Sequence, residues 1–188
     1  MILRPFRRSA NNRTIASLYG MIVAQARSAA FYADYGVPDT VEGRFDLIVL
    51  HLVLLLRRLA RNDGPARDAA VRGLGQRLFD AFCRDLDGNL REMGIGDLAV
   101  PQHMRRFGEA FYGRQAAYLA ALDAADERDF ANALARNILK HAGSGDAAAR
   151  LARYGRAVVR QLDAQADDAL MRGELAFPQP EASADARA

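Results

Sequence analysis

The sequence has few of the features that mark secreted and membrane proteins. Its single cysteine, Cys83, cannot form an internal disulfide, which suits a reducing compartment. No apolar run reaches the roughly 18 residues that a membrane-spanning helix needs. The N-terminus also lacks the apolar core of a signal peptide. We therefore expect a cytoplasmic protein.

Lysine is equally scarce. Lys140 is the only lysine among 26 basic residues, so an excess of arginine produces the net charge of +3 and the isoelectric point near 9.3. We interpret this bias as genome composition, and an anion-binding role is the alternative. The arginines are scattered among 23 acidic residues, with no concentrated basic face on a short recognition helix, so we expect no DNA binding.

Acidic residues are missing from the N-terminal lead, which carries Arg4, Arg7, Arg8 and Arg13. The lead is too short for an organelle transit peptide, and we expect a flexible segment over residues 1–11. Contact of this segment with the ribosome, or with the anionic surface of the inner membrane, is the alternative interpretation. The second contact would make the protein peripheral to the membrane.

Strand-like alternation longer than a few residues is absent, whereas helical periodicity runs through nearly the whole chain. The pattern predicts an all-α fold, a single compact domain of about six helices. This domain spans residues 12–178, and a disordered tail rich in Pro, Ala and Ser follows over residues 179–188. The predicted helices span residues 12–35, 41–62, 65–93, 101–122, 126–141 and 146–172.

Two of the predicted helices have informative apolar patterns. The first helix has one apolar stripe, made of Ile15, Leu18, Ile22, Ala26, Ala29 and Ala33. The second is apolar on all sides over residues 47–56 except for His51, which predicts a central helix packed between the others. We therefore predict that His51 is a hydrogen-bonded core residue rather than a metal ligand.

No catalytic, metal or cofactor motif is complete in the sequence. Asp85, Asp87 and Asn89 match the first ligand positions of a calcium loop, but Leu90 and Gly96 stand where that loop needs glycine and glutamate. The three histidines fall on different predicted helices, without the paired spacing of metal ligands. We therefore expect no enzyme active site, no metal and no cofactor.

Three stretches together resemble the ubiquinol-cytochrome c chaperone family. They are the apolar, histidine-containing helix that ends in RRL, the run LFDAFCRDLDGNLREMGIGDLAVP over residues 78–101, and FGEAFYGR over residues 107–114. The likeness covers roughly residues 12–178. The positions that match the family are His51, Arg58, Asp87, Glu92, Gly94, Gly96, Asp97, Pro101, Phe111, Tyr112 and Gly113.

The resemblance implies an assembly factor rather than an enzyme. Mitochondrial members of the family assist the biogenesis of cytochrome b, so the implied partner is newly made cytochrome b on its way to the respiratory ubiquinol-cytochrome c reductase. Those members carry a long targeting extension and work with a small partner subunit. This sequence lacks the extension, so it looks like a bacterial member that acts alone.

The same stretches predict where a client would bind. Gly94 can take the left-handed conformation that caps the end of a helix. Gly94 and Gly96 let the chain turn sharply, and Pro101 sets the entry of the following helix. Adjacent residues of a helix point about 100° apart, so Phe111 is expected in the core and Tyr112 on the surface. The predicted client-binding residues are Tyr112, Arg106, Arg105, His103, Met104 and Arg58.

An accessory protein that binds a lipid or a quinone is the alternative function. An all-α fold with an apolar second helix can enclose a ligand pocket. An internal cavity of ligand size would favour this alternative over the chaperone.

Overall fold

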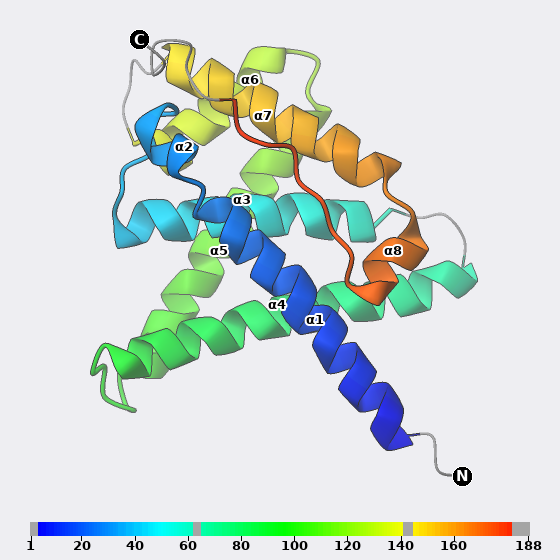
Figure 1. The fold of residues 1–188 in the computed structure, drawn as a ribbon. Helices are drawn as coiled ribbons and strands as arrows, with labels where there is room; N and C mark the ends of the chain where they lie inside the picture. Colours follow the sequence, from blue (N-terminus) through cyan, green and yellow to red (C-terminus); the bar gives the residue numbers. More distant parts are fainter. Residues whose placement is uncertain (1–3, 62–64, 141–144, 182–188) are drawn as a thin grey trace. The chain divides into compact units, whose positions relative to one another are not determined.

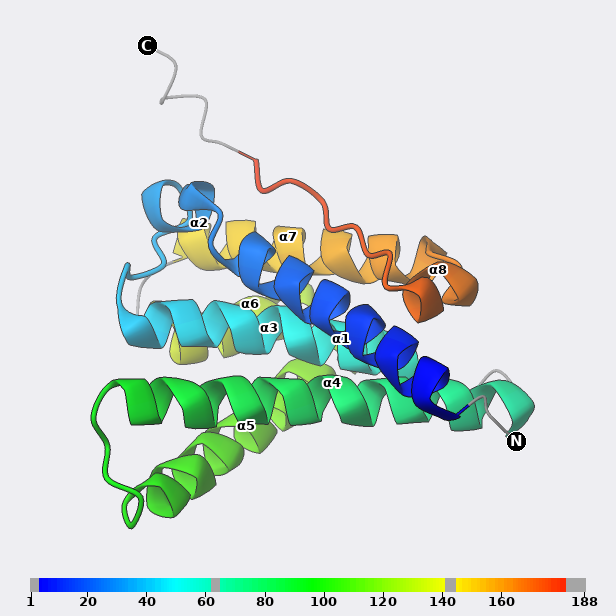
Figure 2. The ribbon, with the colours of Figure 1, turned by 60° about the horizontal axis from the view of Figure 1, so that its bottom comes forward.

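The described part of the chain folds into helices joined by loops (Figures 1 and 2). It comprises residues 4–61, 65–140 and 145–181 of a computed structural model. No strand occurs in these ranges, so the predicted all-α fold is confirmed. The helices are α1 (Arg4–Ala26), α2 (Ala29–Ala33), α3 (Val41–Leu59), α4 (Pro65–Glu92), α5 (Val100–Asp123), α6 (Glu127–Leu134), the π-helix η1 (Ala135–Leu139), α7 (Gly145–Ala164) and α8 (Asp167–Arg172).

The first helix begins earlier than the sequence predicts. It was expected from residue 12, but α1 starts at Arg4, so helical structure extends into the predicted flexible lead. The side chains of residues 4–11 lie outside the described part of the structure. Contact of this lead with the ribosome or the membrane therefore stays a prediction.

The predicted helix over residues 12–35 is divided by a turn at residues 27–28. The prediction that Ala29 and Ala33 continue the buried stripe is wrong, because both are exposed. After the turn, Phe31 and Tyr35 are buried in their place. An aromatic ring buries far more apolar surface than a methyl group, so packing of these rings outweighs the continuation of the helix.

The last two predicted helices are divided as well. Residues 126–141 form α6 and η1, which ends where Lys140 takes a left-handed conformation with a φ of 56°. His141 lies outside the described residues. Residues 146–172 form α7 and α8, which are separated by a break at residues 165 and 166. Gly173 ends the last helix, with a φ of 86°.

The C-terminal segment after α8 stays packed beyond the predicted start of the tail at residue 179. Pro180 is buried, and the backbone N–H of Glu181 donates to Tyr35 Oη at 3.0 Å. Residues 182–188 lie outside the described part of the chain.

Contacts between Cα atoms group the chain into two compact units, each built from three separate segments. Unit 1 comprises Met1–Met21, Leu59–Gly113 and Gln165–Leu175. Unit 2 comprises Ile22–Arg58, Arg114–Ala164 and Ala176–Ala188. Helices α1 and α5 each contribute residues to both units.

Unit 1 is built around α4. One face of α4 buries Leu74, Leu78 and Phe82, and the Phe82 ring lies 5.7 Å from the ring of Phe111 on α5. Helix α8 is tied to α1, because Ser17 Oγ donates to the carbonyl of Gly173 at 2.8 Å. These contacts fix the α4–α5 hairpin to a packed core.

Unit 2 is built around α3. Apart from Ile48, which is half-buried, every residue from Leu47 to Leu55 is buried, which confirms the predicted central helix. Helices α6 and α7 pack against each other, and α5 contributes Tyr118, which is fully buried with its ring 6.2 Å from that of Phe130.

Candidate client-binding surface

The turn between α4 and α5 is fixed by backbone hydrogen bonds. Gly94 has a φ of 80°, which confirms the predicted left-handed cap. The N–H of Gly94 donates to Arg91 O at 3.0 Å, and the N–H of Ile95 donates to Leu90 O at 3.0 Å. This pair of bonds is the Schellman arrangement, which satisfies the last carbonyls of a helix. The conformation strongly favours glycine at position 94.

The start of α5 is defined by the next family-motif residues. The carbonyl of Gly96 accepts hydrogen bonds from the N–H groups of Ala99 at 2.8 Å and Val100 at 3.2 Å. Pro101 lies in the first turn of α5. Backbone N–H groups in a first turn have no partner within the helix, so the missing N–H of proline costs no hydrogen bond there. Gly96 and Pro101 therefore set the direction in which α5 leaves the turn.

Arg91, which no sequence motif indicated as a site residue, links the two sides of this turn. Arg91 Nε donates to Asp87 Oδ2 at 2.7 Å, and its Nη1 forms an ion pair with Asp97. The hydrogen bond from Arg91 lowers the pKa of Asp87, and the same bond raises the pKa of Arg91. Exposed pairs of this kind stabilise a fold only weakly, so their main effect is to orient the turn.

Large apolar side chains are exposed on this hairpin. Met93 is 62% exposed, Leu98 is 99% exposed and Tyr112 is 58% exposed. In the described part of the chain the other exposed large apolar residue is Val41, at the start of α3. We call Met93, Leu98, Arg105 and Tyr112 the hairpin surface.

Helix α5 places its aromatic residues on two different faces, as predicted. Phe111 is 1% exposed, with its ring 4.8 Å from that of Phe79, whereas Tyr112 is exposed. Arg105 precedes Tyr112 by seven residues and therefore lies on the same stripe, to within about 20°. Arg106 is exposed too, but it points about 120° away from Tyr112.

The remaining predicted client-binding residues are less accessible. His103 and Met104 are half-buried on the first turns of α5. Arg58 is only 5% exposed, and its Nε donates to the carbonyl of Leu162 at 2.8 Å within unit 2. Arg58 is thus a buried residue, whereas direct contact with a client would need an exposed one.

His51 is the core residue that the sequence predicts. Its Nδ1 lies 2.7 Å from Leu47 O, which can only accept, so Nδ1–H donates and the neutral ring accepts at Nε2 from Tyr154 Oη at 2.7 Å. Tyr154 Oη in turn accepts from Gln25 Nε2 at 2.9 Å. Burial lowers the pKa of His51 from 6.5 to about 4. The imidazole is therefore neutral at physiological pH.

A buried carboxylate at the start of α3 was not predicted. Asp46 is fully buried, and its Oδ1 lies 2.7 Å from Arg114 Nη2 on α5. Its Oδ2 lies 3.4 Å from Nζ of Lys140, the lysine that ends η1. Burial raises the pKa of Asp46, while the two cations oppose that shift. The chain's only lysine thus helps to neutralise a buried charge.

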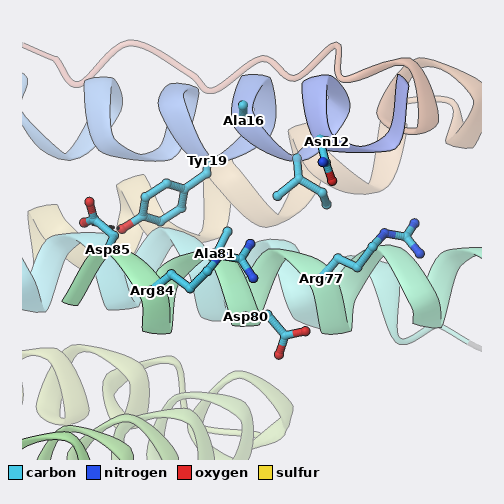
Figure 3. A pocket seen from close by; sticks show the side chains of 9 residues that line it. Asn12, Ala16, Tyr19, Arg77, Asp80, Ala81, Arg84 and Asp85 are labelled. Atoms are coloured by element: carbon cyan, nitrogen blue, oxygen red, sulfur yellow. Dashed lines mark hydrogen bonds between the residues drawn. The ribbon is translucent and has the colours of Figure 1, made fainter. Parts of the chain in front are cut away.

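A groove of about 660 Å³ lies between α1 and α4 in unit 1 (Figure 3). Asn12, Ala16 and Tyr19 project from α1, and Tyr19 Oη donates to Asp85 Oδ2 at 2.9 Å. The α4 side is charged and carries Arg77, Asp80, Arg84 and Asp85. A lipid tail or a quinone needs an apolar enclosure, so this groove does not favour the alternative function.

The described helices show neither a membrane span nor a metal cluster. None of them combines the length and the apolar character that crossing a bilayer requires. Across residues 4–61, 65–140 and 145–181, no three His, Cys, Asp or Glu side chains converge as metal ligands would.

Comparison with known proteins agrees with this architecture. Residues 33–177 match the model of the family described as ubiquinol-cytochrome C chaperone. The chain is also similar to the crystal structure of a Cbp3 homolog from Brucella abortus, with 40% sequence identity and a TM-score of 0.82. The similarity covers 95% of this chain and 97% of the other. No curated protein matches the chain. The protein described here therefore belongs to the ubiquinol-cytochrome c chaperone family.

Proposed function

We propose that this chaperone binds newly made cytochrome b and assists biogenesis of the respiratory ubiquinol-cytochrome c reductase. We further propose that the hairpin surface contacts the client. The observation that carries the second proposal is the exposure of Met93, Leu98 and Tyr112 on one hairpin. The same hairpin holds the sequence run that most closely follows the family.

The chemistry of these side chains suits an apolar client. Cytochrome b is a bundle of apolar helices, which need cover from water until the bundle is complete. Methionine has a flexible, polarisable side chain that adapts to irregular apolar partners, and Leu98 offers almost its whole side chain. Tyrosine and arginine are the residue types that most often dominate interface energies, and Tyr112 and Arg105 share one stripe.

The rigid support of the surface favours the same role. The Schellman bonds at Gly94 and the ion pairs of Arg91 hold the turn, while Phe111 anchors α5 next to Tyr112. A preformed surface loses less conformational entropy on binding than a flexible one. Arg106 and His103 lie on other faces of α5 and would contact the client only where it wraps around the helix.

A pulldown from solubilised membranes tests both proposals. The tagged protein should retain cytochrome b, identified by mass spectrometry, and Leu98→Ser should reduce its recovery. Val41→Ser is the matched control, because it removes an exposed apolar side chain that lies outside the hairpin.

The two proposals fail in different ways. Absence of cytochrome b from the wild-type pulldown would contradict the function itself. Recovery that drops equally for Leu98→Ser and Val41→Ser would contradict only the assignment of the surface.

We also propose that the protein works at the inner membrane, because its client is inserted there. Cell fractionation with and without expression of cytochrome b tests this location. A membrane-bound fraction that disappears when the client is absent supports it, and an unchanged distribution contradicts it.

A further inference from the structure

A second pocket lies in unit 2, along α7. It has a volume of about 470 Å³ and is closed on one side by Pro178, Gln179 and Glu181 of the C-terminal segment. That segment returns beside α7 in both views (Figures 1 and 2). The pocket contains none of the residues of the hairpin surface.

The lining of this pocket is strongly basic. Its charged residues are Arg150, Arg153, Arg156, Arg160, Glu127 and Glu181. Four arginines against two glutamates leave an excess of two positive charges. The arginines follow one another on α7 at spacings of three, three and four residues. They therefore lie within about 120° of the helix circumference. Like charges at these spacings destabilise a helix, so the cluster has a cost that folding alone does not explain.

Two of the arginines are held in place by other groups of unit 2. Arg150 Nη1 donates to the carbonyl of Asp34 at 2.7 Å, and its guanidinium lies 5.8 Å from the centre of the Tyr35 ring. The Arg156 guanidinium lies 5.8 Å from the centre of the Phe130 ring. Such contacts hold a guanidinium group in a fixed position.

The other two arginines present their charge to solvent. Arg153 and Arg160 are exposed, and neither forms a salt bridge with any residue in the described part of the chain. Several other exposed arginines do lie close to acids, as Arg91 does beside Asp87 and Asp97 and Arg44 beside Asp39. Genome composition therefore accounts for the number of arginines but not for this grouping.

We propose that the pocket on α7 binds a phosphate group, carried either by a phospholipid headgroup or by a free phosphate compound. A phosphate monoester carries a charge of about −1.5 to −2 at neutral pH, which matches the two excess positive charges. Its three terminal oxygens can accept hydrogen bonds from several guanidinium groups at once. A single carboxylate of an acidic peptide offers half that charge and two oxygens.

Two probes separate the sources of the phosphate. The first is inorganic phosphate, titrated at constant ionic strength and followed by ³¹P NMR. The second is a set of phosphatidylcholine vesicles with and without phosphatidic acid, assayed by co-sedimentation. Binding of inorganic phosphate alone assigns a free compound, whereas binding that requires phosphatidic acid assigns a headgroup. Either result supports the site.

Two double variants test which residues bind. Arg153→Gln/Arg160→Gln should weaken binding by at least about tenfold, because two charge-assisted contacts are lost. The control Arg27→Gln/Arg84→Gln removes the same charge from exposed positions outside the pocket and should stay within about twofold of wild type. Circular dichroism melting curves show whether all variants are folded.

Three outcomes would overturn the site. The wild-type protein could bind neither probe. The two double variants could lose affinity equally, which would indicate attraction by net charge alone. A polyglutamate peptide could bind where both phosphate probes fail, which would make the pocket a contact for an acidic protein segment.

Discussion

The α4–α5 hairpin of unit 1 and the α3 helix of unit 2 place polar and apolar side chains in opposite ways. The hairpin exposes Met93 and Leu98, although large apolar side chains are usually buried in the core of a protein. Helix α3 buries Asp46, His51 and Arg58, which solvent would hydrate better. Each of these three buried residues has at least one polar partner, whereas Met93 and Leu98 on the hairpin are exposed to solvent.

This contrast separates two kinds of family-motif residue. His51 and Arg58 hold unit 2 together, and their substitution should first affect folding. Asp87, Gly94 and Asp97 shape an exposed turn. Their substitution should first affect the hairpin surface and its binding of a client. A residue shared by a family can therefore matter for stability or for binding, and its burial decides which.

The largest effect on stability is expected inside the hairpin, at Phe111. Phe111→Ala removes a ring that packs 4.8 Å from Phe79 and 5.7 Å from Phe82. The lost burial and the cavity left behind should cost about 4 kcal/mol of the free energy of unfolding. Urea denaturation followed by circular dichroism measures this change. A midpoint close to that of wild type would show that the hairpin core is not packed as described.

A slightly smaller effect is expected in unit 2, where Arg114→Met leaves Asp46 buried with Lys140 as its remaining partner. Breaking a buried ion pair costs about 3 kcal/mol or more, because the remaining charge has lost its closer partner. The loss should shrink as the pH is lowered, since protonation removes the charge of Asp46 and burial already raises its pKa.

The double variant Arg114→Met/Asp46→Asn is the matched control for this pair. It removes the uncompensated charge as well, so most of the lost stability should return. A double variant as unstable as Arg114→Met would show that packing of the arginine, not its charge, is what matters.

The pH dependence of stability provides a third test of unit 2. The folded protein keeps His51 neutral down to about pH 4, whereas the unfolded chain takes up the proton near pH 6.5. Protons therefore favour the unfolded state between these values, and stability should fall as the pH drops from 6.5 to 4. The contribution of His51 is at most about 3 kcal/mol.

His51→Gln isolates this contribution, because glutamine can hydrogen bond but does not titrate. Its free energy of unfolding should depend less steeply on pH in this window than that of wild type. Equal slopes for the two proteins would mean that the histidine is not buried as a neutral ring.

The sequence predicted features that depend on neighbouring residues and missed those that join distant ones. The burial of α3, the left-handed cap at Gly94 and the outward position of Tyr112 all follow from local pattern or helical geometry. The partner of His51, in contrast, is Tyr154, which lies 103 residues further along the chain. A local sequence pattern cannot predict a contact between residues so far apart in the chain.

The errors have the same origin. Arg58 is predicted to contact a client, yet it is buried, and the carbonyl of Leu162, 104 residues away, accepts its hydrogen bond. The turn at residues 27–28 was missed because alanines there continue a helical pattern. The rings of Phe31 and Tyr154, whose centres lie 4.9 Å apart, stabilise the alternative path through a contact between distant segments.

A small change in stability, and the sharpest test of the contrast, is expected at Tyr112. Tyr112→Ala truncates a side chain that is 58% exposed, so the free energy of unfolding should change by only about 0.5–1 kcal/mol. Recovery of cytochrome b should nevertheless fall, because an exposed tyrosine beside an arginine is typical of an interface centre.

Charge reversal then shows how far the contact extends around α5. Arg105→Glu should impair capture as Tyr112→Ala does, since Arg105 shares the stripe of Tyr112, whereas Arg106→Glu should impair it less because Arg106 points about 120° away. Both arginines are exposed, so thermal unfolding should be nearly unchanged in both variants.

If Arg106→Glu abolished capture while Arg105→Glu retained it, the client would bind the opposite flank of α5. If Tyr112→Ala melted as early as Phe111→Ala, the hairpin would be core rather than surface, and the contrast between the two regions would not hold.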